Sequence, residues 1–433
     1  MPMCNRWFIF TAFVAIIVAI LLIIAAYSSA QRRATIVKLQ LVIIAESLLF
    51  LGANFVWKQL VDVLDPTKSK SNGSICDFIF LLWRAVVFLF LVLAQCSIIL
   101  GEFIIGNEPY WLVFLSYVCL GTFVILISVL MPVLTIEFCI NGVLGSGRPL
   151  RQVNQFMKVT GVILITILLT YSGVETAAEG PWQKEVDIHV NKLPQSMDGF
   201  KVAQLSDIHL GPTVGQSQLR KAVDIANDFN PDLVVITGDL VDSNVDSLKT
   251  VIEPIKYLKS KHGIYFVTGN HEYHTGDVDN WFVHLKSLGI SPLHNDRVEI
   301  HNQDNPDDWF YLAGIDDKFA NDIKYTGHGM DLDKTLENTD YNHAIILLAH
   351  QPKAAYTALE SQYDVSLVLS GHTHAGHILP FMLGVYLMNP YFAGLYQHSD
   401  NSYVYVSSGT YYWGMPMRLA STPEVTYITL KAA

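Results

Sequence analysis

Residues Val365–Ile378 read VSLVLSGHTHAGHI, an apolar run that stops at Ser370 and continues into a segment with three histidines and two glycines. Continuous apolar runs of this length are typical of strands that are buried on both faces. Histidine occurs in proteins as a hydrogen-bonding core residue, as a pH-sensitive group or as a metal ligand. A single His-x-His motif favours an ordinary loop or core, so its meaning depends on whether the pattern recurs in the chain.

Four other apolar runs end in polar residues in the same way. They are FKVAQL before SDIHLG (200–211), DLVVIT before GDLVD (232–242), GIYFVT before GNHEYH (263–274) and HAIILL before AHQP (343–352). Helical stretches at Gln216–Phe229 and Asp246–Lys261 lie between these runs, which predicts an α/β fold. Because ligands bind at the carboxyl ends of strands in α/β sheets, five such strand ends predict one shared polar site.

The spacing of the polar residues fits a shared site. Asp207 and His209 are two residues apart, as are His372 and His374. In an extended segment such residues point to the same face, so each pair can reach one centre. Glycines in three of the segments allow sharp turns and a close approach of the backbone to a ligand: Gly238, Gly269 and Gly371.

Two aspartates, one asparagine and four histidines are the candidate metal ligands: Asp207, His209, Asp239, Asn270, His350, His372 and His374. Mixed oxygen and nitrogen ligands favour Mn, Fe or Zn over Mg or Ca, which prefer shells of oxygen. Seven ligands are too many for one ion and fit two divalent metal ions that share a bridging carboxylate. Two ions about 3.5–4 Å apart bind the attacking and leaving oxygens of a phosphoryl group and lower the pKa of a bound water.

The five segments SDIHLG, GDLVD, GNHE, AHQP and GHTHAGH together resemble the calcineurin-like metallophosphoesterase superfamily, from about Val186 to Leu430. The segment GLY (394–396) and the later YVSSGTYYWGMPMRLASTPEVTYITL (405–430) are similar to its membrane-anchored bacterial branch, and apolar helices before such a domain resemble a membrane-bound animal branch. The alternation of strands and helices alone indicates only α/β. The resemblance implies a four-layer α/β/β/α sandwich and a metal-dependent phosphoric ester hydrolase.

The resemblance also implies roles for individual residues. Metal one would be bound by Asp207, His209, Asp239 and His374, and metal two by Asp239, Asn270, His350 and His372, with Asp239 bridging. His271 would be the catalytic residue, either as a general acid for the leaving group or as a stabiliser of phosphate charge. The residues themselves offer no G-x-S-x-G or Cys/His nucleophile, which agrees with attack by water.

Some residues depart from the superfamily pattern or exceed the ligand count. Its protein phosphatases have Arg-Gly after GDxxD, whereas Ser243 and Asn244 stand here, which weakens a phosphoprotein-phosphatase hypothesis. We interpret Asp242 as a structural turn residue. For His274 and His377, contact with the ligands or substrate and a solvated loop position remain equal alternatives.

The two halves of the chain are built for different solvents. Residues 1–175 hold 11 Lys and Arg and 8 Asp and Glu, whereas residues 176–433 hold 17 and 31 and all 15 histidines. Overall, 51% of the 433 residues are hydrophobic and 15% are charged, against about 25% charged in a soluble domain. We expect a helical membrane region at 1–175 and a catalytic domain at 176–433. The acidic second half excludes nucleic acid as a partner.

Five stretches approach the roughly 20 apolar residues that a membrane-spanning helix needs: Trp7–Tyr27, Val37–Trp57, Phe78–Leu100, Trp111–Ile136 and Met157–Ser172. The first is longer than the apolar part of a signal peptide, so a retained helix is favoured over a cleaved one. Glu46 and Arg84 lie inside apolar runs, where ionisable groups are costly. We interpret them as a structural ion pair between the second and third spans, with a functional role as the alternative.

Lys and Arg in short loops indicate the cytoplasmic side of a multi-pass membrane protein. With five spans, most of them lie at the N-terminus and in the second and fourth loops, on the side away from the C-terminal domain. We therefore expect the catalytic domain to be extracytoplasmic or lumenal. The sequon Asn72-Gly73-Ser74 falls in a loop expected to be cytoplasmic and disagrees with this orientation.

The segment Ile378–Tyr396, ILPFMLGVYLMNPYFAGLY, directly follows the histidines and is strongly apolar. Core packing is the simpler interpretation. The alternative is an apolar lip beside the site that holds an acyl chain or contacts the bilayer. Together with the membrane helices, it favours a phospholipid or another lipid-linked phosphate as the substrate.

The sequence as a whole predicts a membrane-anchored, dinuclear-metal hydrolase of phosphoesters, acting as a phosphodiesterase or pyrophosphatase on a lipid-linked phosphate. The alternative is a pseudoenzyme or receptor that binds a phosphorylated ligand without turnover, against which the complete ligand set and His271 argue. A transporter with a regulatory domain is a weaker alternative, because the spans contain few polar residues and no internal repeat.

Overall fold

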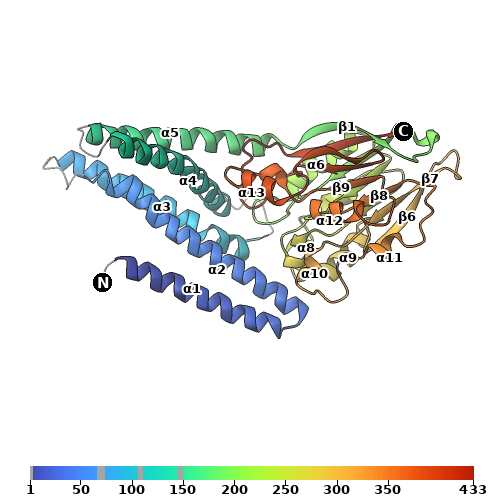
Figure 1. The fold of residues 1–433 in the computed structure, drawn as a ribbon, viewed down its shortest axis with the longest axis horizontal. Coiled ribbons are helices and arrows are strands. Elements are labelled where there is room, and N and C mark those ends of the chain that lie inside the picture. The colour runs from blue at the N-terminus through green and yellow to red at the C-terminus, as the bar shows by residue number, and fades with distance from the viewer. Residues whose placement is uncertain (1–2, 66–73, 106–110, 145–149) are drawn as a thin grey trace.

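The computed structural model describes residues 3–65, 74–105, 111–144 and 150–433. It has a region of long helices at one end and a domain of two packed sheets at the other (Figure 1). Asn72 and Gly73 of the predicted sequon lie outside the described residues.

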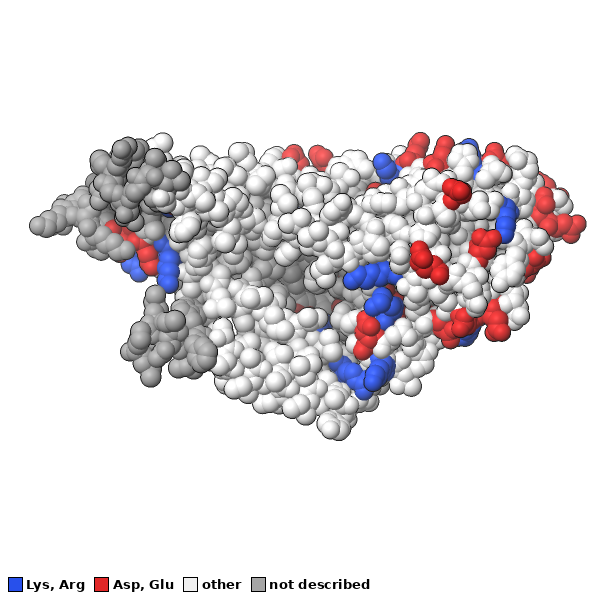
Figure 2. Space-filling model, in the orientation of Figure 1, with Lys and Arg blue, Asp and Glu red and all other residues white. Residues whose placement is uncertain are grey.

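Long apolar helices make up the first part of the chain: α1 (Met3–Ala26), α2 (Ala30–Trp57), α3 (Ser74–Phe103), α4 (Trp111–Leu144) and α5 (Leu150–Glu179), with a π-helical turn at Lys58–Asp62 after α2. Within the described residues, four segments are long and apolar enough to cross a membrane: Arg32–Asp62, Asp77–Phe103, Trp111–Ile140 and Gln155–Glu179. The first predicted span falls in α1, where the apolar stretch is shorter, Phe10–Ala26. On the face seen in Figure 2, a zone without charged side chains covers much of the helices.

The ionisable residues inside the helices do not form the predicted pair. Glu46 accepts a hydrogen bond from Gln95, and Arg84 lies over the rings of Trp57 and Phe80, 5.9 and 6.0 Å from their centroids. The interpretation of Glu46 and Arg84 as an ion pair is therefore wrong. Gln95 of α3 contacts one oxygen of Glu46, whose Oε1 has no hydrogen-bond partner among the described residues, and aromatic rings of α2 and α3 contact Arg84.

The second part contains twelve strands in two six-stranded sheets within the described residues. The first sheet has the order β1-β12-β2-β3-β4-β5, from Trp182–Val190, Glu424–Ala432, Phe200–Leu205, Leu233–Ile236, Ile264–Phe266 and Ser291–Pro292. The second has the order β10-β11-β9-β8-β7-β6, from Gly394–Ser399, Ser402–Val406, Leu367–Ser370, Ile345–Leu348, Trp309–Gly314 and Asp296–His301. All five predicted strands are present, three in the first sheet and two in the second.

Apolar side chains fill three layers between and outside the sheets. Val202, Val235, Leu348 and Leu369 belong to a buried cluster to which both sheets contribute, so the sheets pack face to face. Helices cover the outer faces: α6 (Gln216–Asp228) and α9 (Val278–Ser287) on the first sheet, α12 (Pro352–Leu359) on the second. The predicted four-layer α/β/β/α sandwich is confirmed.

Shorter helices complete the domain: α7 (Val245–Leu248), α8 (Asn270–His274), α10 (Phe319–Asp322), α11 (Leu332–Leu336), α13 (Phe381–Met388) and 3₁₀ turns at Gln195–Met197, Glu253–Tyr257 and His374–Gly376. The predicted helix Gln216–Phe229 is present as α6. The predicted helix Asp246–Lys261 is wrong, because α7 ends at Leu248 and a separate 3₁₀ turn begins at Glu253, with Pro254 as its second residue. Proline lacks the N–H that a continuous helix needs.

The boundary between the two parts follows the end of α5. This helix continues to Glu179, and β1 begins at Trp182. The expected boundary between residues 175 and 176 thus falls in the last turn or so of α5, a few residues before the sheet domain begins.

Candidate metal centre

The carboxyl ends of neighbouring strands bring the polar segments together. β2, β3 and β4 are parallel neighbours in the first sheet, and β8 and β9 are parallel neighbours in the second. The side-chain amide of Gln204 on β2 donates to the carbonyl of Ser370 at the end of β9, 2.9 Å away. This bond joins the two sheets where their polar loops begin, so both sheets contribute to one site.

The backbone is strained at five of the seven candidate ligand positions. Their φ angles are positive: 53° at Asp207, 53° at His209, 51° at Asp239, 72° at His372 and 48° at His374. Non-glycine residues in this region cost about 1–3 kcal/mol each, and such strain concentrates at functional sites. The surrounding sheets hold these side chains in directions that an extended loop would not give.

Asp207, His209 and His374 form the first group whose ligand atoms converge, all within 4.8 Å of one another. The Nε2 atoms of His209 and His374 are 3.0 Å apart, and His374 Nε2 is 3.5 Å from Asp207 Oδ1. The His372 backbone N–H donates to Asp207 Oδ1 over 2.9 Å, which orients this carboxylate. All three residues are buried.

Asp239, His350 and His372 form the second group, with ligand atoms again within 4.8 Å of one another. Asp239 Oδ2 lies 3.1 Å from His350 Nε2, and His372 Nδ1 lies 3.3 Å from the same nitrogen. His350 Nδ1 is 2.8 Å from the carbonyl of Thr237, to which it donates. That bond leaves Nε2 directed into the group.

Asp239 connects the two groups, because Oδ2 is also 3.7 Å from His209 Nε2. Next to it, Asn270 begins α8, and its buried Oδ1 has no hydrogen-bond partner among the described residues. A buried polar oxygen without a partner costs free energy unless a ligand satisfies it. The donor set and this orphaned oxygen therefore fit divalent cations.

The many carboxyl and imidazole groups packed into the site shift one another's pKa values. Burial opposes ionisation of Asp239, but the imidazolium groups of His350 and His271 outweigh it and hold the pKa of this carboxyl well below its usual value. Burial and the same charged neighbours lower the pKa of His372 to about 3, so its ring is neutral. Metal ligands must be deprotonated, and a cation takes the place of the protons that balance these carboxylates.

Asp242 is not only a turn residue, so the interpretation from the sequence is incomplete. One oxygen, Oδ1, is 2.8 Å from both His209 Nδ1 and His271 Nδ1. A carboxylate behind a metal-ligating histidine fixes the ring orientation and its tautomer. The spacing of Asp242 three residues after Asp239 was the available signal, but only the fold shows which rings it meets.

His271 lies on α8 beside both carboxylates. Burial lowers its basicity, but Asp239 and Asp242 outweigh that effect and raise the pKa of His271 to about 9. The imidazole is therefore protonated at neutral pH. The Nε2 atom of His271 makes no hydrogen bond to a described residue. The centroids of the His271 and Trp413 rings are 5.3 Å apart.

Glu272 and Arg418 are functional candidates that the sequence interpretation missed. The buried carboxylate of Glu272 accepts from four backbone N–H groups, and so shapes the loop that holds Asp239: those of Asp239 (3.0 Å), Leu240 (2.8 Å), Val241 (3.2 Å) and Gly269 (2.6 Å). The buried Arg418 Nη1 lies 3.1 Å from His374 Nδ1. Glu272 follows directly in GNHE, whereas nothing local indicates Arg418, 44 residues beyond His374.

The two surplus histidines have core surroundings. His377 is buried, and its Nε2 donates to the carbonyl of Met415 over 3.2 Å. The ring of His274 contacts those of His271 and Phe319, at 5.5 and 4.5 Å between centroids. A solvated loop position is wrong for His377, because the C-terminal loop covers it.

A further group of possible ligand atoms, His294, Asp316 and His328, lies outside this site. Asp316 is buried, and its oxygens are 2.8 Å from His294 Nδ1 and 3.4 Å from His328 Nδ1. The backbone N–H of Gly329 also donates to it over 3.0 Å. Hydrogen bonds among these residues account for the cluster.

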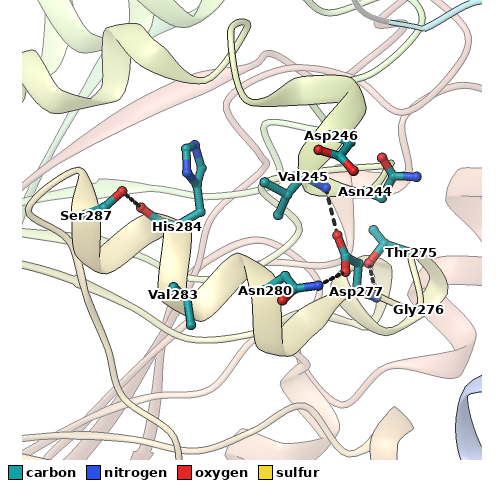
Figure 3. A pocket seen from close by; sticks show the side chains of 10 residues that line it. All are labelled: Asn244, Val245, Asp246, Thr275, Gly276, Asp277, Asn280, Val283, His284 and Ser287. Atoms are coloured by element: carbon teal, nitrogen blue, oxygen red, sulfur yellow. Dashed lines mark hydrogen bonds between the residues drawn. The ribbon is translucent and has the colours of Figure 1, made fainter.

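A cavity of about 580 Å³ opens near the loops that follow Asp242 and His274 in the chain (Figure 3). Polar residues line it, and the Asp277 carboxylate accepts from the Val245 backbone over 2.9 Å and from the Asn280 side chain over 2.6 Å. None of the seven candidate ligands lines this cavity, so it is separate from the metal centre.

Glycines stand where the backbone meets a ligand side chain, as expected. A Cβ atom on Gly371 would lie 2.0 Å from Ser206 Oγ and 2.2 Å from Asp207 Oδ2. One on Gly269 would lie 2.2 Å from Asp239 Oδ1, and one on Gly238, whose φ is 89°, would lie 2.7 Å from His350 Nδ1. Close packing here leaves no room for a methyl group.

Substitution Gly371→Ala should therefore displace Asp207. We expect the free energy of unfolding to fall by about 1–3 kcal/mol through overpacking, and divalent-metal affinity to fall roughly tenfold or more. Chemical denaturation and metal titration of the purified protein measure the two effects. Gly384→Ala is the matched control, because nothing lies within 4 Å of the added methyl. Equal behaviour of the two variants would contradict the tight approach at Gly371.

The sequence of this chain is similar to those of known proteins. A family model described as calcineurin-like phosphoesterase matches residues 200–376. The transmembrane protein with metallophosphoesterase domain of Danio rerio is 43% identical over 408 residues, 93% of this chain and 91% of that protein. An uncharacterized metallophosphoesterase of Helicobacter pylori is 36% identical over 280 residues, 65% of this chain and 72% of its own length. A solved dimetal phosphatase from Danio rerio covers 49% of this chain and 88% of its own, at 15% identity and a TM-score of 0.35.

The matches extend over both parts of the molecule. The family model covers the segment from β2 to the last histidine turn, which contains all seven candidate ligands. The Danio rerio relative aligns with most of the chain, including the apolar helices. The resemblance expected from the sequence is confirmed, and the chain belongs to the calcineurin-like phosphoesterase family as a metal-dependent phosphoric ester hydrolase joined to membrane-type helices.

Proposed function

We propose that residues 176–433 form the catalytic domain of a dinuclear-metal hydrolase that helices of residues 1–175 hold at a membrane. The observation that supports it most is the pair of converging groups, Asp207–His209–His374 and Asp239–His350–His372. Metal one would be held by the first group with Asp239, and metal two by the second group with Asn270. Asp239 would bridge, since Oδ2 faces histidines of both groups.

Mixed carboxylate, amide and imidazole ligands favour Mn, Fe or Zn as the two ions. When bound, such ions supply Lewis-acid activation of a water nucleophile and of the phosphoryl oxygens. The protein's own contribution is to hold the ligands in strained, fixed directions and to keep the imidazoles oriented. Asp242 and Thr237 do this from behind, by accepting from the second ring nitrogens of His209 and His350 respectively.

His271 is proposed as the residue that acts on the substrate directly. Asp242 fixes its Nδ1, so a proton on Nε2 points away from this contact. A protonated imidazole at that place donates to the oxygen of the leaving group, or to a non-bridging oxygen of the phosphate. A general acid of this kind needs to lie within hydrogen-bond reach of the group it protonates.

The substrate class proposed is a phosphodiester or pyrophosphate of a membrane lipid. Support comes from the helices long enough to cross a bilayer and from the apolar helix α13, which follows the histidine turn after four residues. Core packing, the simpler interpretation of Ile378–Tyr396, holds for the buried Ile378 and Tyr391 but not for α13, none of whose side chains is buried.

The test is hydrolysis by the purified full chain with Mn, Zn, Fe or no metal. Chromogenic phosphodiester and monoester substrates are compared with a lipid phosphodiester and a lipid pyrophosphate in vesicles. Metal-dependent turnover that is faster for the lipid substrates supports the proposal. Comparable turnover of lipid and soluble diesters removes the lipid preference, and tight binding of two metals without turnover of any substrate favours a phospho-ligand receptor.

The catalytic domain is proposed to be extracytoplasmic or lumenal. α2 and α4 begin, and α3 and α5 end, at the end of the bundle that faces the sandwich (Figure 1). Basic residues at that end have structural partners: Arg33 donates to the carbonyl of Ile323 over 2.7 Å, and Lys38 pairs with Glu102 at 2.8 Å. These cations therefore need not indicate a cytoplasmic side. The orientation is tested by adding a membrane-impermeant reagent for a C-terminal tag to intact cells, to cells with a selectively permeabilised plasma membrane and to fully permeabilised cells. Labelling that first appears when the cytosol alone becomes accessible contradicts the proposed orientation.

A further inference from the structure

Helix α13 presents apolar side chains in every direction that the rest of the chain leaves open. Its sequence is FMLGVYLM, and no Lys, Arg, Asp or Glu occurs between Gly376 and Ser399. None of its side chains is buried, and Leu383 and Leu387 are 63% and 72% exposed. A contiguous apolar surface of this kind indicates a contact with another apolar phase.

The position of α13 along the membrane helices indicates which phase that is. The Oγ atom of Ser128 on α4, which donates to the Val124 carbonyl over 2.8 Å, also lies 3.4 Å from the carbonyl oxygen of Leu379, close before α13. Ser128 lies in the apolar segment Trp111–Ile140, which has 30 residues. The hydrocarbon core of a bilayer takes about 20 of them, and every such stretch within Trp111–Ile140 includes Ser128. Leu379 is therefore at hydrocarbon depth wherever along α4 the membrane begins.

Further contacts tie the same region to the spanning helices. Ile378 belongs to a buried cluster with Leu120 and Ile125 of α4. On the other side of the site, a Cβ atom on Gly121 would lie 2.5 Å from Met417 Sδ. The segments on both sides of the histidine turn thus pack against the membrane region, and α13 continues that apolar surface.

The backbone of α13 suits a segment in lipid. Its eight residues extend only about 12 Å, too short to cross a bilayer. At its beginning, Met382 N–H donates to the carbonyl of Ile378 over 3.3 Å, and at its end Asn389 donates to the carbonyl of Val385 over 2.9 Å. Within hydrocarbon each backbone polar group needs an internal partner, and these bonds supply several of them.

We propose that α13 inserts into the hydrocarbon of the same bilayer that the long helices span, as a short re-entrant helix beside the metal centre. A Cβ atom on Gly376 would lie 2.3 Å from Met382 Cα, so α13 rests directly on the turn that holds His374. This places the entrance to the site at the lipid surface. The consequence for the substrate, a lipid whose acyl chains contact α13 while its phosphate reaches the site, rests on the proposed function.

Lipid photocrosslinking of the full chain in phosphatidylcholine vesicles tests the insertion without reference to activity. A photoreactive amino acid is placed at Leu387, and in a matched protein at Val283 of α9, which is apolar and 70% exposed on the sandwich. We expect roughly tenfold or more lipid adduct at Leu387 than at Val283. Equal adduct at the two positions would overturn the insertion of α13, and protein–protein adducts at Leu387 would identify a second copy as its partner instead.

A second measurement separates the two proposals. Leu387→Asp should lower turnover of a lipid phosphodiester in vesicles roughly tenfold while leaving turnover of a soluble chromogenic diester unchanged, because a buried carboxylate is costly in lipid. Val283→Asp should change neither. Equal rates on the lipid substrate for both variants would overturn the role of α13 at the entrance. Absence of turnover in every protein, with lipid adduct at Leu387 retained, would reject the hydrolase function and keep the insertion.

Discussion

Replacing Asp239 by asparagine is expected to reduce metal-dependent phosphodiester hydrolysis at least roughly a thousandfold, because this carboxylate is the proposed bridge between both ions. The change keeps the shape of the side chain, and Oδ1 can still accept from the His271 backbone, 2.8 Å away. The other terminal atom faces His350 Nε2 at 3.1 Å, where an amide NH₂ cannot coordinate a cation. We therefore expect the content of bound metal to fall as well.

The measurements are kcat/KM and the amount of metal per chain by elemental analysis, on the purified full chain. Asp246→Asn is the matched control, since its side chain is 94% exposed and pairs only with Lys249 nearby. We expect this control to behave as the unmodified protein. Full metal occupancy and an undiminished rate in the Asp239 variant would show that Asp239 is not a ligand.

Replacing His271 by alanine is expected to lower kcat about 100- to 10,000-fold and to leave the metal content unchanged, because the ring is proposed to donate a proton to the substrate and not to bind either ion. Its backbone N–H remains available to Asp239, so the loop keeps its main contact. Two substrates that differ only in the leaving group distinguish the two possible roles. A general acid matters more for a poor alkoxide leaving group than for nitrophenolate, whereas a stabiliser of phosphate charge matters equally for both.

His301→Ala serves as the control for this variant, since that ring is 45% exposed and far along the chain on β6. A loss of metal together with activity in His271→Ala would contradict a role limited to the substrate.

Replacing Asp242 by asparagine is expected to have a smaller effect. It weakens the support for both His209 and His271, so we expect the rate to fall about 10- to 100-fold and the metal affinity to fall as well.

The strands and the polar residues at their ends were predictable because both depend on local patterns. Continuous apolar runs such as LVVI and LVLS form central strands, buried on both faces, in either sheet. Asp207 and His372 were identified because a polar residue directly after such a run can only lie at the edge of the sheet. The division of the chain into an apolar helical part and an acidic, histidine-rich part follows from composition alone.

Predictions from local sequence patterns failed in two situations. Either a second local feature, such as a proline, interrupted an expected element, or the contact of a residue depended on a partner distant in the sequence. The expected helix ends at Leu248, and a separate 3₁₀ turn that contains Pro254 follows from Glu253. Glu46 contacts Gln95, and Arg84 lies over Trp57, so the two do not pair with each other. Whether the side chains of Ile378–Tyr396 are buried depends on the helices and loops that pack against this segment. Periodicity in the sequence cannot distinguish an exposed apolar helix from a buried one.

By itself, the sequence determined the residue types, their spacing and the strand ends, and hence the seven candidate ligands, while the resemblance to the superfamily pointed to His271. The tertiary structure decided how these residues divide into two converging groups, with Asp239 between them. It also decided that Asp242 accepts from the ring of His209 and that Arg418 lies against the ring of His374, since these contacts join residues 33 and 44 positions apart. The physical reason is that strand and turn formation depends on neighbours along the chain, whereas ring orientation and depth beside the membrane helices depend on side chains that only the folded sheets and helices bring into contact.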